Sequence, residues 1–202
     1  MIILSEVLGH GAARYCYLYP DDKNLCVKIE LTPDANSYEI HVYNSVKTLI
    51  PGQIPCIYPD TIETDKGAGI LCQVIRDEPD GKISPNFIEF KRSGDFNLVY
   101  SSLNRIIKRL IARDIFFYDF NKGNFVVQTL KDGSKKVWFI DVKSLNRTGY
   151  LGFLHLERIF APLARVIMFR RIRGLYKDLG LKFPFENLCC KKFLSTFFIT
   201  VK

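Results

Sequence analysis

The sequence lacks the long apolar runs that would place it in a membrane. No uninterrupted apolar stretch comes near the roughly 20 residues that a membrane-spanning helix needs, so we expect no such helix. The opening residues, MIILSEVLGHG, do not join a basic stretch to a long apolar run. We therefore expect no secretory signal and a cytoplasmic protein. Internal repeats and low-complexity tracts are also absent, which excludes solenoid and fibrous architectures.

Metal-binding and disulfide patterns are missing as well. The three histidines are scattered, and the adjacent pair Cys189–Cys190 has no second pair at zinc-site spacing. Four of the six cysteines stand in apolar, strand-like runs, as Cys26 and Cys72 do. In a reducing compartment such cysteines behave as small buried hydrophobic residues. We expect neither a structural zinc site nor a disulfide framework.

What is present is a globular composition with an excess of basic residues. The chain has 202 residues, of which 48% are hydrophobic, enough for one compact domain or two small lobes. The net charge of +8 arises mainly late in the chain, at Arg158, Arg165, Arg170, Arg171, Arg173, Lys177, Lys182, Lys191 and Lys192. Such a basic region can attract nucleic acid, anionic lipid or a phosphorylated substrate. The alternative is an ordinary solvated helix face.

The first half predicts a β-rich segment with one helix. Apolar runs separated by turn residues predict a β-meander whose strands lie at 2–8, 14–18 and 24–31. Helical spacing of apolar residues predicts a helix over 37–49. Proline, aspartate and glycine in 51–69 predict a loop with a short strand, and the apolar run 69–75 predicts a buried strand.

The second half predicts mainly helices around one hairpin. A turn over 76–85 is the best candidate for a boundary between lobes. An amphipathic helix is predicted over 96–113, with Leu98, Leu103, Ile106, Ile107, Leu110 and Ile111 on its apolar face. A polar loop at 119–124, strands at 125–127 and 137–142 around a turn at 131–133, and a helix over 154–176 complete the order. This order predicts an α+β fold with two unlike halves.

Two features of the β-rich segment point to phosphate chemistry. Gly9 and Gly11 lie between two predicted strands, where glycine lets the backbone approach phosphate oxygens without a Cβ in the way. Lys28 is the one lysine in a β-branched strand, and Glu39 follows eleven positions later on the predicted helix. In kinases a strand lysine held by a helix glutamate positions the α- and β-phosphates. Taken alone, the glycines could form a plain hairpin and Lys28 could be an exposed strand lysine.

Two features of the second half point to a metal-assisted transfer. Asp119 is followed five residues later by Asn124, the spacing of the kinase loop in which Asp accepts the proton of a substrate hydroxyl and Asn binds metal. Asp141 stands at the end of the returning strand, where the hairpin brings it alongside Asn124 and its carboxylate could bind Mg²⁺. The alternative is that these polar side chains only cap turns.

Together these residues resemble the signature of the protein-kinase-like superfamily. Two runs, LGHGAARYCY at 8–17 and CVKI at 26–29, are more similar to the small bacterial YrbL family. That family is named as a component of the PhoP regulatory network. The similarity extends over most of residues 1–175, and Val74 and Ile75 open a segment like the family's link between lobes. The resemblance implies a kinase-like fold and nucleotide contacts at Val74 and Ile75. Arg14 stands where the usual glycine loop has its third glycine.

The sequence thus predicts a small bilobal kinase-like fold that binds ATP and Mg²⁺. Residues 1–78 are predicted to form a β-rich nucleotide-binding lobe and residues 79–202 a mainly helical lobe with the catalytic and metal-binding loop. The predicted function is atypical phosphoryl transfer to an unidentified hydroxyl acceptor. The first alternative is a catalytically inactive, nucleotide-binding pseudokinase with a regulatory role. The second is a binder of nucleic acid or anionic lipid through the basic C-terminal helix.

Overall fold

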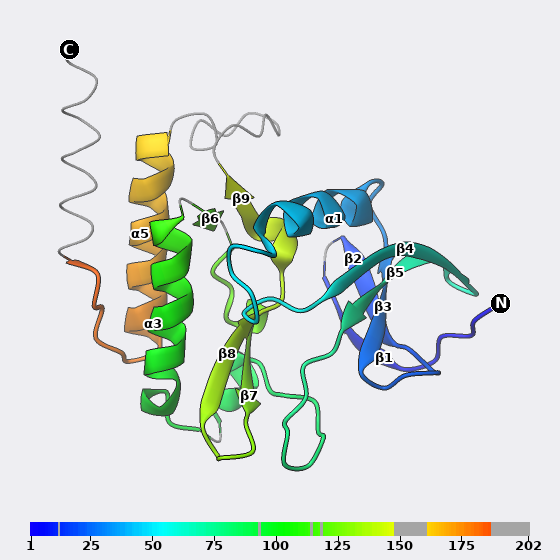
Figure 1. The fold of residues 1–202 in the computed structure, drawn as a ribbon, viewed down its shortest axis with the longest axis horizontal. Coiled ribbons are helices and arrows are strands. Elements are labelled where there is room, and N and C mark those ends of the chain that lie inside the picture. Colours follow the sequence, from blue (N-terminus) through cyan, green and yellow to red (C-terminus); the bar gives the residue numbers. More distant parts are fainter. Residues whose placement is uncertain (12, 93, 114, 118, 148–160, 187–202) are drawn as a thin grey trace.

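The chain is a mixed α+β protein with a sheet-rich N-terminal part and its longer helices later (Figure 1). The computed structural model describes residues 1–186 except 12, 93, 114, 118 and 148–160. Five antiparallel strands form one sheet in the order β1-β2-β3-β5-β4. Their bounds are Val7–His10 (β1), Arg14–Leu18 (β2), Leu25–Glu30 (β3), Ile57–Thr64 (β4) and Gly67–Gln73 (β5). The predicted meander of the first three strands is confirmed.

The two faces of the sheet have different partners. Val27 and Ile29 pack with Leu4 on the outer face, where the N-terminal segment crosses the sheet. Backbone bonds at Ile2 and Asp65 fix this segment beside the β4–β5 turn. The predicted first strand at 2–8 is therefore wrong in extent: β1 begins only at Val7, because the apolar residues before it cover the outer face instead of continuing the strand.

The region predicted as a loop with a short strand contains a full edge strand. β4 spans eight residues and pairs with β5 through a tight turn at Asp65 and Lys66. Pro59 lies in β4 at a register shift between Tyr58 and Thr61. Proline is tolerated there because β4 is an edge strand and one side of its ladder is unpaired. Residues 51–56 form the predicted loop, whereas Pro59 and Asp60 lie in the edge strand.

Gly69 of β5 pairs with Ile29 of the neighbouring strand β3, where the side chains of β3 leave no room for a Cβ. A Cβ at this position would lie 2.6 Å from Val27 Cγ1 and 2.7 Å from Ile29 Cδ1. We therefore expect Gly69→Ala to lower the free energy of unfolding by about 1–3 kcal/mol through overpacking. Gly174→Ala is the matched control: its Cβ would meet nothing within 4 Å in a helix, so it should be neutral or stabilise by up to about 1 kcal/mol. Urea denaturation of both variants checks the contrast, and equal effects would contradict it.

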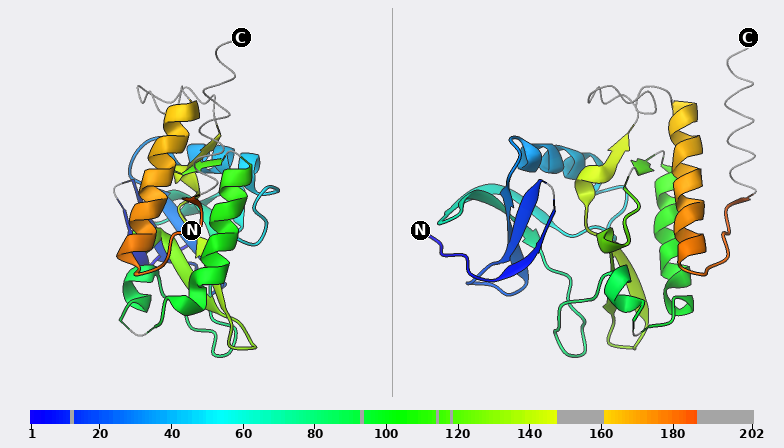
Figure 2. Two further views of the ribbon diagram at one scale, coloured as in Figure 1. Left: turned by 90° about the vertical axis from the view of Figure 1, so that its left-hand side faces the viewer. Right: turned by 180° about the vertical axis from the view of Figure 1, so that it is seen from behind.

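Helix α1 lies beside the inner face of the sheet. It spans Ala35–Val46, so it begins and ends slightly earlier than the predicted range of 37–49. Its Val42 and Val46 are buried in the main core, and the helix also contacts β3 and the segment that follows β8. Figures 1 and 2 show α1 between the sheet and the rest of the chain. A residue on α1 can therefore reach both.

The predicted turn after β5 is present and tightly bonded. Arg76 donates to the backbone oxygens of Lys23 and Gly81, and Asp77 accepts from Ser84 and from Thr129. This segment therefore ties the β2–β3 turn to the later hairpin. It is followed by a short helix, α2 (Phe87–Phe90), which the sequence reading missed. Its signal was the capping box formed by Asn86 and Glu89.

The second half is built on α3 and a hairpin. Its elements are α3 (Asn97–Ala112), β6 (Ile115–Phe117), β7 (Phe125–Thr129), β8 (Lys135–Phe139), β9 (Leu145–Arg147) and α5 (Ala161–Asp178). β6 pairs with β9, and β7 pairs with β8. The predicted helix over 96–113 is confirmed, but Leu98 is 59% exposed and Val99 takes its place in the core. The part of the last predicted helix before residue 161 lies outside the described residues.

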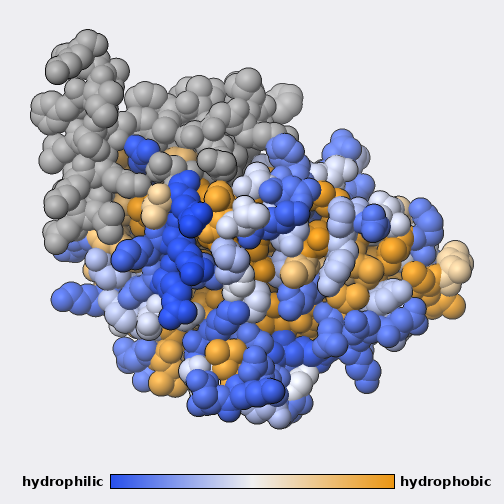
Figure 3. Space-filling view, viewed as in Figure 1, coloured by the Kyte–Doolittle hydropathy of each residue, from blue (hydrophilic) through white to orange (hydrophobic). Residues whose placement is uncertain are grey.

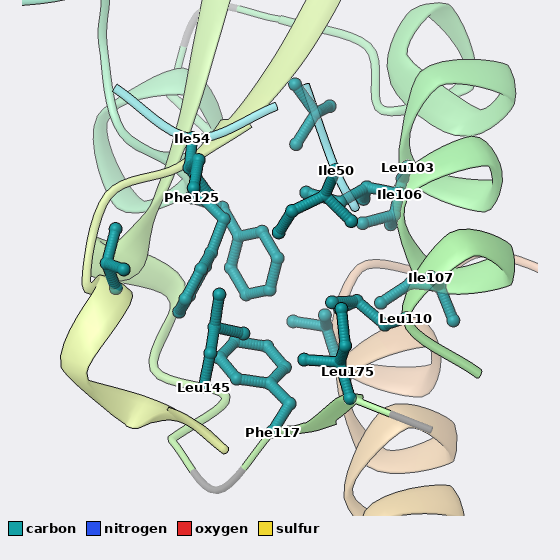
Figure 4. Packing of buried hydrophobic residues seen from close by; sticks show 14 of the residues in the cluster. Ile50, Ile54, Leu103, Ile106, Ile107, Leu110, Phe117, Phe125, Leu145 and Leu175 are labelled. Atoms are coloured by element: carbon teal, nitrogen blue, oxygen red, sulfur yellow. The ribbon is translucent and has the colours of Figure 1, made fainter. Parts of the chain in front are cut away.

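One hydrophobic cluster runs through both halves. It contains residues of the sheet such as Cys26 and Cys72, and residues of α3, α5 and the hairpin; Figure 4 shows Ile50 and Ile54 among side chains of α3 and the hairpin. Cys26 and Cys72 are free and buried, as expected. The division into lobes at 1–78 and 79–202, and a kinase-like arrangement of them, stay predictions. No described helix is both long and apolar enough to cross a membrane.

Candidate functional site

Lys28 and Glu39 form a buried ion pair between β3 and α1. The Lys28 Nζ lies 3.0 Å from Glu39 Oε1 and 3.2 Å from Oε2. Lys28 is 7% exposed and Glu39 is fully buried. The alternative of an exposed strand lysine is therefore wrong: Lys28 lies opposite Ile70 on the inner face, which α1 covers. The expected contact is present, while its role in nucleotide binding stays a prediction.

Arg14 is a third member of this cluster that the sequence reading missed. It opens β2, and the pairing of Cys16 with Lys28 places Arg14 on the same inner face, two residues away along the strand. Its Nη1 donates to Glu39 Oε2, and its Nη2 lies 4.0 Å from Asp141 Oδ1. The sequence signal that could have found Arg14 is the alternation of side chains along the strand, which puts Arg14 and Cys16 on one face. Only the fold brings Arg14 to α1.

Each ionisable group in the cluster depends on its neighbours. Burial would raise the pKa of Glu39, but Lys28 and Arg14 outweigh burial and hold this pKa below its usual value. Burial would lower the pKa of Lys28, but Cys72 and Glu39 outweigh it and raise this pKa above its ordinary value. Lys28 and Glu39 are therefore both charged at neutral pH. For Asp141, burial dominates and raises the pKa of the carboxyl.

Asn36 helps to set the position of α1 against β3. Its Nδ2 donates to the backbone oxygen of Lys28 at 3.1 Å, and its backbone N–H donates to Glu30. Both bonds fix the first turn of α1 beside the strand that carries Lys28. The side chain of Glu39, one turn later, is then directed at the lysine.

The loop between β6 and β7 holds Asp119 and Asn124 together. Asp119 Oδ1 accepts from the Asn121 backbone, and Asn124 Nδ2 donates to Asp119 Oδ2 at 3.0 Å. Asn121 accepts in turn from the Gly123 backbone and begins a short 3₁₀ turn. These are the turn-capping bonds that the alternative interpretation expects. They also fix Asp119, which is exposed, against Asn124.

Asp141 lies next to this loop, although the predicted strand over 137–142 is too long. β8 ends at Phe139, and Asp141 begins a 3₁₀ turn at Val142–Ser144 that lies against α1. The Ile140 backbone N–H donates to the Asn124 backbone oxygen at 2.9 Å, which joins the segment of Asp141 to the loop. The chain turns just after the pairing of β7 and β8 ends, and this turn directs Asp141 toward Arg14 and Glu39.

The oxygen donors of Asn124 and Asp141 suit a hard cation. The Asn124 amide donates through Nδ2, which leaves its Oδ1 as an acceptor, and Asp141 supplies a carboxylate. Mg²⁺ is commonly held by one or two such protein groups together with substrate phosphates. Within the described part of the chain, no group of three or more His, Cys, Asp or Glu side chains is placed to hold a metal ion. Binding of Mg²⁺ here stays a prediction.

Gly9 lies in β1, where it pairs with Cys16 of β2, and Gly11 lies in the turn between these two strands. Neither has a positive φ, and a Cβ at either position would meet no atom within 4 Å. The Gly11 backbone N–H donates to the Arg14 backbone oxygen at 2.9 Å and so closes the hairpin. Neither local strain nor crowding among the described residues requires glycine here.

Val74 and Ile75 follow β5 and are buried in different clusters. Val74 packs with the main core that includes Cys72, and Ile75 packs against Val126 and Trp138. The Val74 backbone N–H donates to Asn24, and the Ile75 backbone oxygen accepts from Ser84. Nucleotide contact at these two residues stays a prediction.

Most of the basic residues of α5 whose side chains the structure describes are exposed, whereas Arg165 is half-buried. Arg170, Arg173 and Lys177 are exposed, and Arg173 pairs with Glu186 at 3.0 Å. Figure 3 shows hydrophilic residues over the region where α3 lies in Figure 1, and Arg105 and Lys108 of α3 are exposed. Arg158, Lys191 and Lys192, like Cys189–Cys190, lie outside the described residues. Binding of an anionic partner stays a prediction.

The fold and the site define a mixed α+β protein with a buried cluster of two cations and two carboxylates at the inner face of its sheet. The chain belongs to the family described as "PhoP regulatory network protein YrbL", whose sequence model matches residues 2–161. It is 34% identical over 122 residues to "Uncharacterized protein YrbL" of Escherichia coli (strain K12), and equally to that of Shigella flexneri. This match spans 54% of the chain and 56% of each relative, about half the relatives' length.

Proposed function

We propose that this chain binds ATP with Mg²⁺ and transfers a phosphoryl group to a hydroxyl acceptor, as an atypical kinase. The observation that carries the proposal is the buried Lys28–Glu39 pair beside Asp141. Kinases position the α- and β-phosphates with a strand lysine held by a helix glutamate. Two charges would rarely be buried together for stability alone, because desolvation offsets most of their attraction. A functional role explains why the pair is kept.

The remaining residues have complementary roles in the proposed transfer. Lys28 donates to phosphate oxygens, and Asn124 and Asp141 hold the Mg²⁺. When bound, Mg²⁺ neutralises charge on the phosphates. Asp119 accepts the acceptor proton as the acceptor oxygen bonds to the γ-phosphorus. The bond to the β–γ bridging oxygen breaks, and its electron pair leaves with ADP.

The base of the nucleotide would lie against the segment after β5. The Val74 N–H and the Ile75 oxygen are already bonded within the protein. Recognition of adenine would therefore use the other two peptide groups, the Val74 oxygen and the Ile75 N–H. Both side chains are already buried in the protein, so these two peptide groups would carry the contact.

Binding and transfer can be measured separately on the full chain. At ATP concentrations about 100-fold above Kd, with MgCl₂, we expect about 2.7 kcal/mol of stabilisation, seen as a rise in Tm. The second measurement is ADP release with serine, a sugar and a nucleoside as acceptors. Guanidine-unfolded protein is the control for adventitious ATPase. A Tm that does not respond to Mg²⁺–ATP would reject the proposal.

A regulatory pseudokinase is the second candidate function. The family's description as a PhoP regulatory network protein favours a regulatory role. Both oxygens of Asp119 accept hydrogen bonds within its own loop, which suits a structural task. This candidate predicts the same rise in Tm with Mg²⁺–ATP but no ADP above the unfolded control. ADP release with any of the three acceptors would contradict it.

A further inference from the structure

Arg14 is a buried cation to which the roles described so far give no task. Its side chain is 7% exposed, on the same face of the sheet as Lys28 and within reach of both Glu39 and Asp141. We propose that Arg14 is a second phosphate-binding cation, which makes the site selective for nucleotides with two or three phosphates over monophosphates. This inference rests on the proposed nucleotide binding and adds the residue that sets phosphate-number specificity.

The charge balance of the cluster favours an anionic ligand. Lys28 contacts both oxygens of Glu39, and Arg14 contacts one of the same oxygens. Two cations thus share one carboxylate, which leaves one positive charge on this trio. Asp141 is the next carboxylate, but its Oδ1 lies 4.0 Å from the guanidinium, beyond hydrogen-bond distance. A bound polyphosphate would supply the missing negative charge.

The guanidinium of Arg14 also has N–H donors that make no hydrogen bond to the described residues. Arginine carries five N–H donors in a planar fork that matches phosphate oxygens in pairs. Toward the described residues, Arg14 donates one hydrogen bond, from Nη1 to Glu39. Nη2 is directed toward Asp141 without reaching hydrogen-bond distance. It can therefore donate to a phosphate oxygen without breaking a hydrogen bond to the described residues.

The glycine turn explains why a side chain would take over this task. In a conventional glycine loop, backbone N–H groups and a third glycine lie over the phosphates. Here the Gly11 N–H closes the hairpin by donating to the Arg14 backbone oxygen. That donor is therefore engaged, and the third glycine position carries Arg14 itself. The side chain points inward to Glu39, on the face that holds Lys28.

The alternative is that Arg14 only neutralises Glu39. The test is isothermal titration of the full chain with ATP, ADP and AMP in MgCl₂, comparing wild type with Arg14→Met. We expect ATP affinity to fall about 10- to 100-fold, the range for losing a charge-assisted hydrogen bond, and AMP affinity to change less than about 2-fold. Arg105→Met, at an exposed arginine of α3, is the matched control and should change neither.

Each outcome decides between the roles. Equal affinities of wild type and Arg14→Met for ATP overturn the Arg14 proposal and leave nucleotide binding standing, as does an equal loss for all three nucleotides. If wild type binds none of them, both proposals fail. Should Arg14→Met not fold, Arg14→Lys decides: it keeps the charge but loses the fork, so its ATP-to-AMP selectivity should fall about 2- to 10-fold. Unchanged selectivity in a folded Arg14→Lys counts against the proposal.

Discussion

Glu39→Ala should lower the free energy of unfolding by about 3–5 kcal/mol, because it leaves two buried cations without their carboxylate. Glu39 is fully buried, and it accepts hydrogen bonds from both Lys28 and Arg14. Removing it forfeits both interactions while the desolvation of the cations remains. Denaturation in urea at pH 7 measures the loss. Glu63→Ala, at an exposed glutamate of β4, should change stability by less than about 0.5 kcal/mol.

A triple variant separates the cost of an unpaired charge from the value of the cluster. Arg14→Met, Lys28→Met and Glu39→Leu together remove every charge of the trio and keep its volume. Replacing a buried ionic cluster by apolar residues is often neutral or stabilising. We therefore expect the triple variant to recover most of the stability that Glu39→Ala loses. If it is as unstable as the single variant, the loss reflects packing and the charge argument is wrong.

The same residue should give the protein an acid-sensitive part of its stability. The pKa of Glu39 is lowered in the folded state from a usual value of 4.5. A lowered folded pKa contributes stability above the unfolded pKa, and this is lost as pH falls through the folded value. Wild type should therefore lose this part of its stability below about pH 4.5. Glu39→Gln should lack this contribution, and identical pH profiles would contradict the assignment.

Asp119→Asn and Asp141→Asn should both strongly reduce phosphoryl transfer, but for different reasons. Loss of the proposed base at Asp119 should reduce transfer about 100- to 10,000-fold while Mg²⁺–ATP still raises Tm. Loss of the proposed metal ligand at Asp141 should reduce transfer about 100-fold or more and also weaken the response of Tm to Mg²⁺–ATP. ADP release and Tm, measured on both variants, check the two roles.

Without nucleotide, the two variants should also differ in stability. Burial raises the pKa of Asp141, so its ionised form destabilises the folded state above the unfolded pKa. Asp141→Asn removes that charge and should raise Tm in the absence of ligand. Asp119 is exposed, and its substitution by Asn keeps an oxygen for the Asn121 backbone, so Tm should change little. A lower Tm for Asp141→Asn would show that Asp141 stabilises the fold through Arg14.

The parts of the fold that the sequence predicted well are those in which apolar residues recur at a regular spacing. The helix over 96–113 and the strands at 14–18 and 24–31 depend on local patterns, and α3, β2 and β3 lie there. The strand predicted within 51–69 was too short, because the edge strand β4 accepts residues that normally indicate a loop. The end of β8 at Phe139 was missed because the ladder, and not the apolar run, ends the strand.

The sequence alone determined the family, the alternation that sets Lys28 against Val27 and Ile29, and the spacing of Asp119 and Asn124 in one loop. These are local properties, since side-chain direction along a strand and reach within a loop follow from the backbone. Only the tertiary structure decided that Lys28 is buried and that Arg14 shares Glu39 with it. It also brought Asp141 to Arg14. The reason is that charge, burial and pKa depend on which elements α1 packs against, and local sequence does not encode that contact.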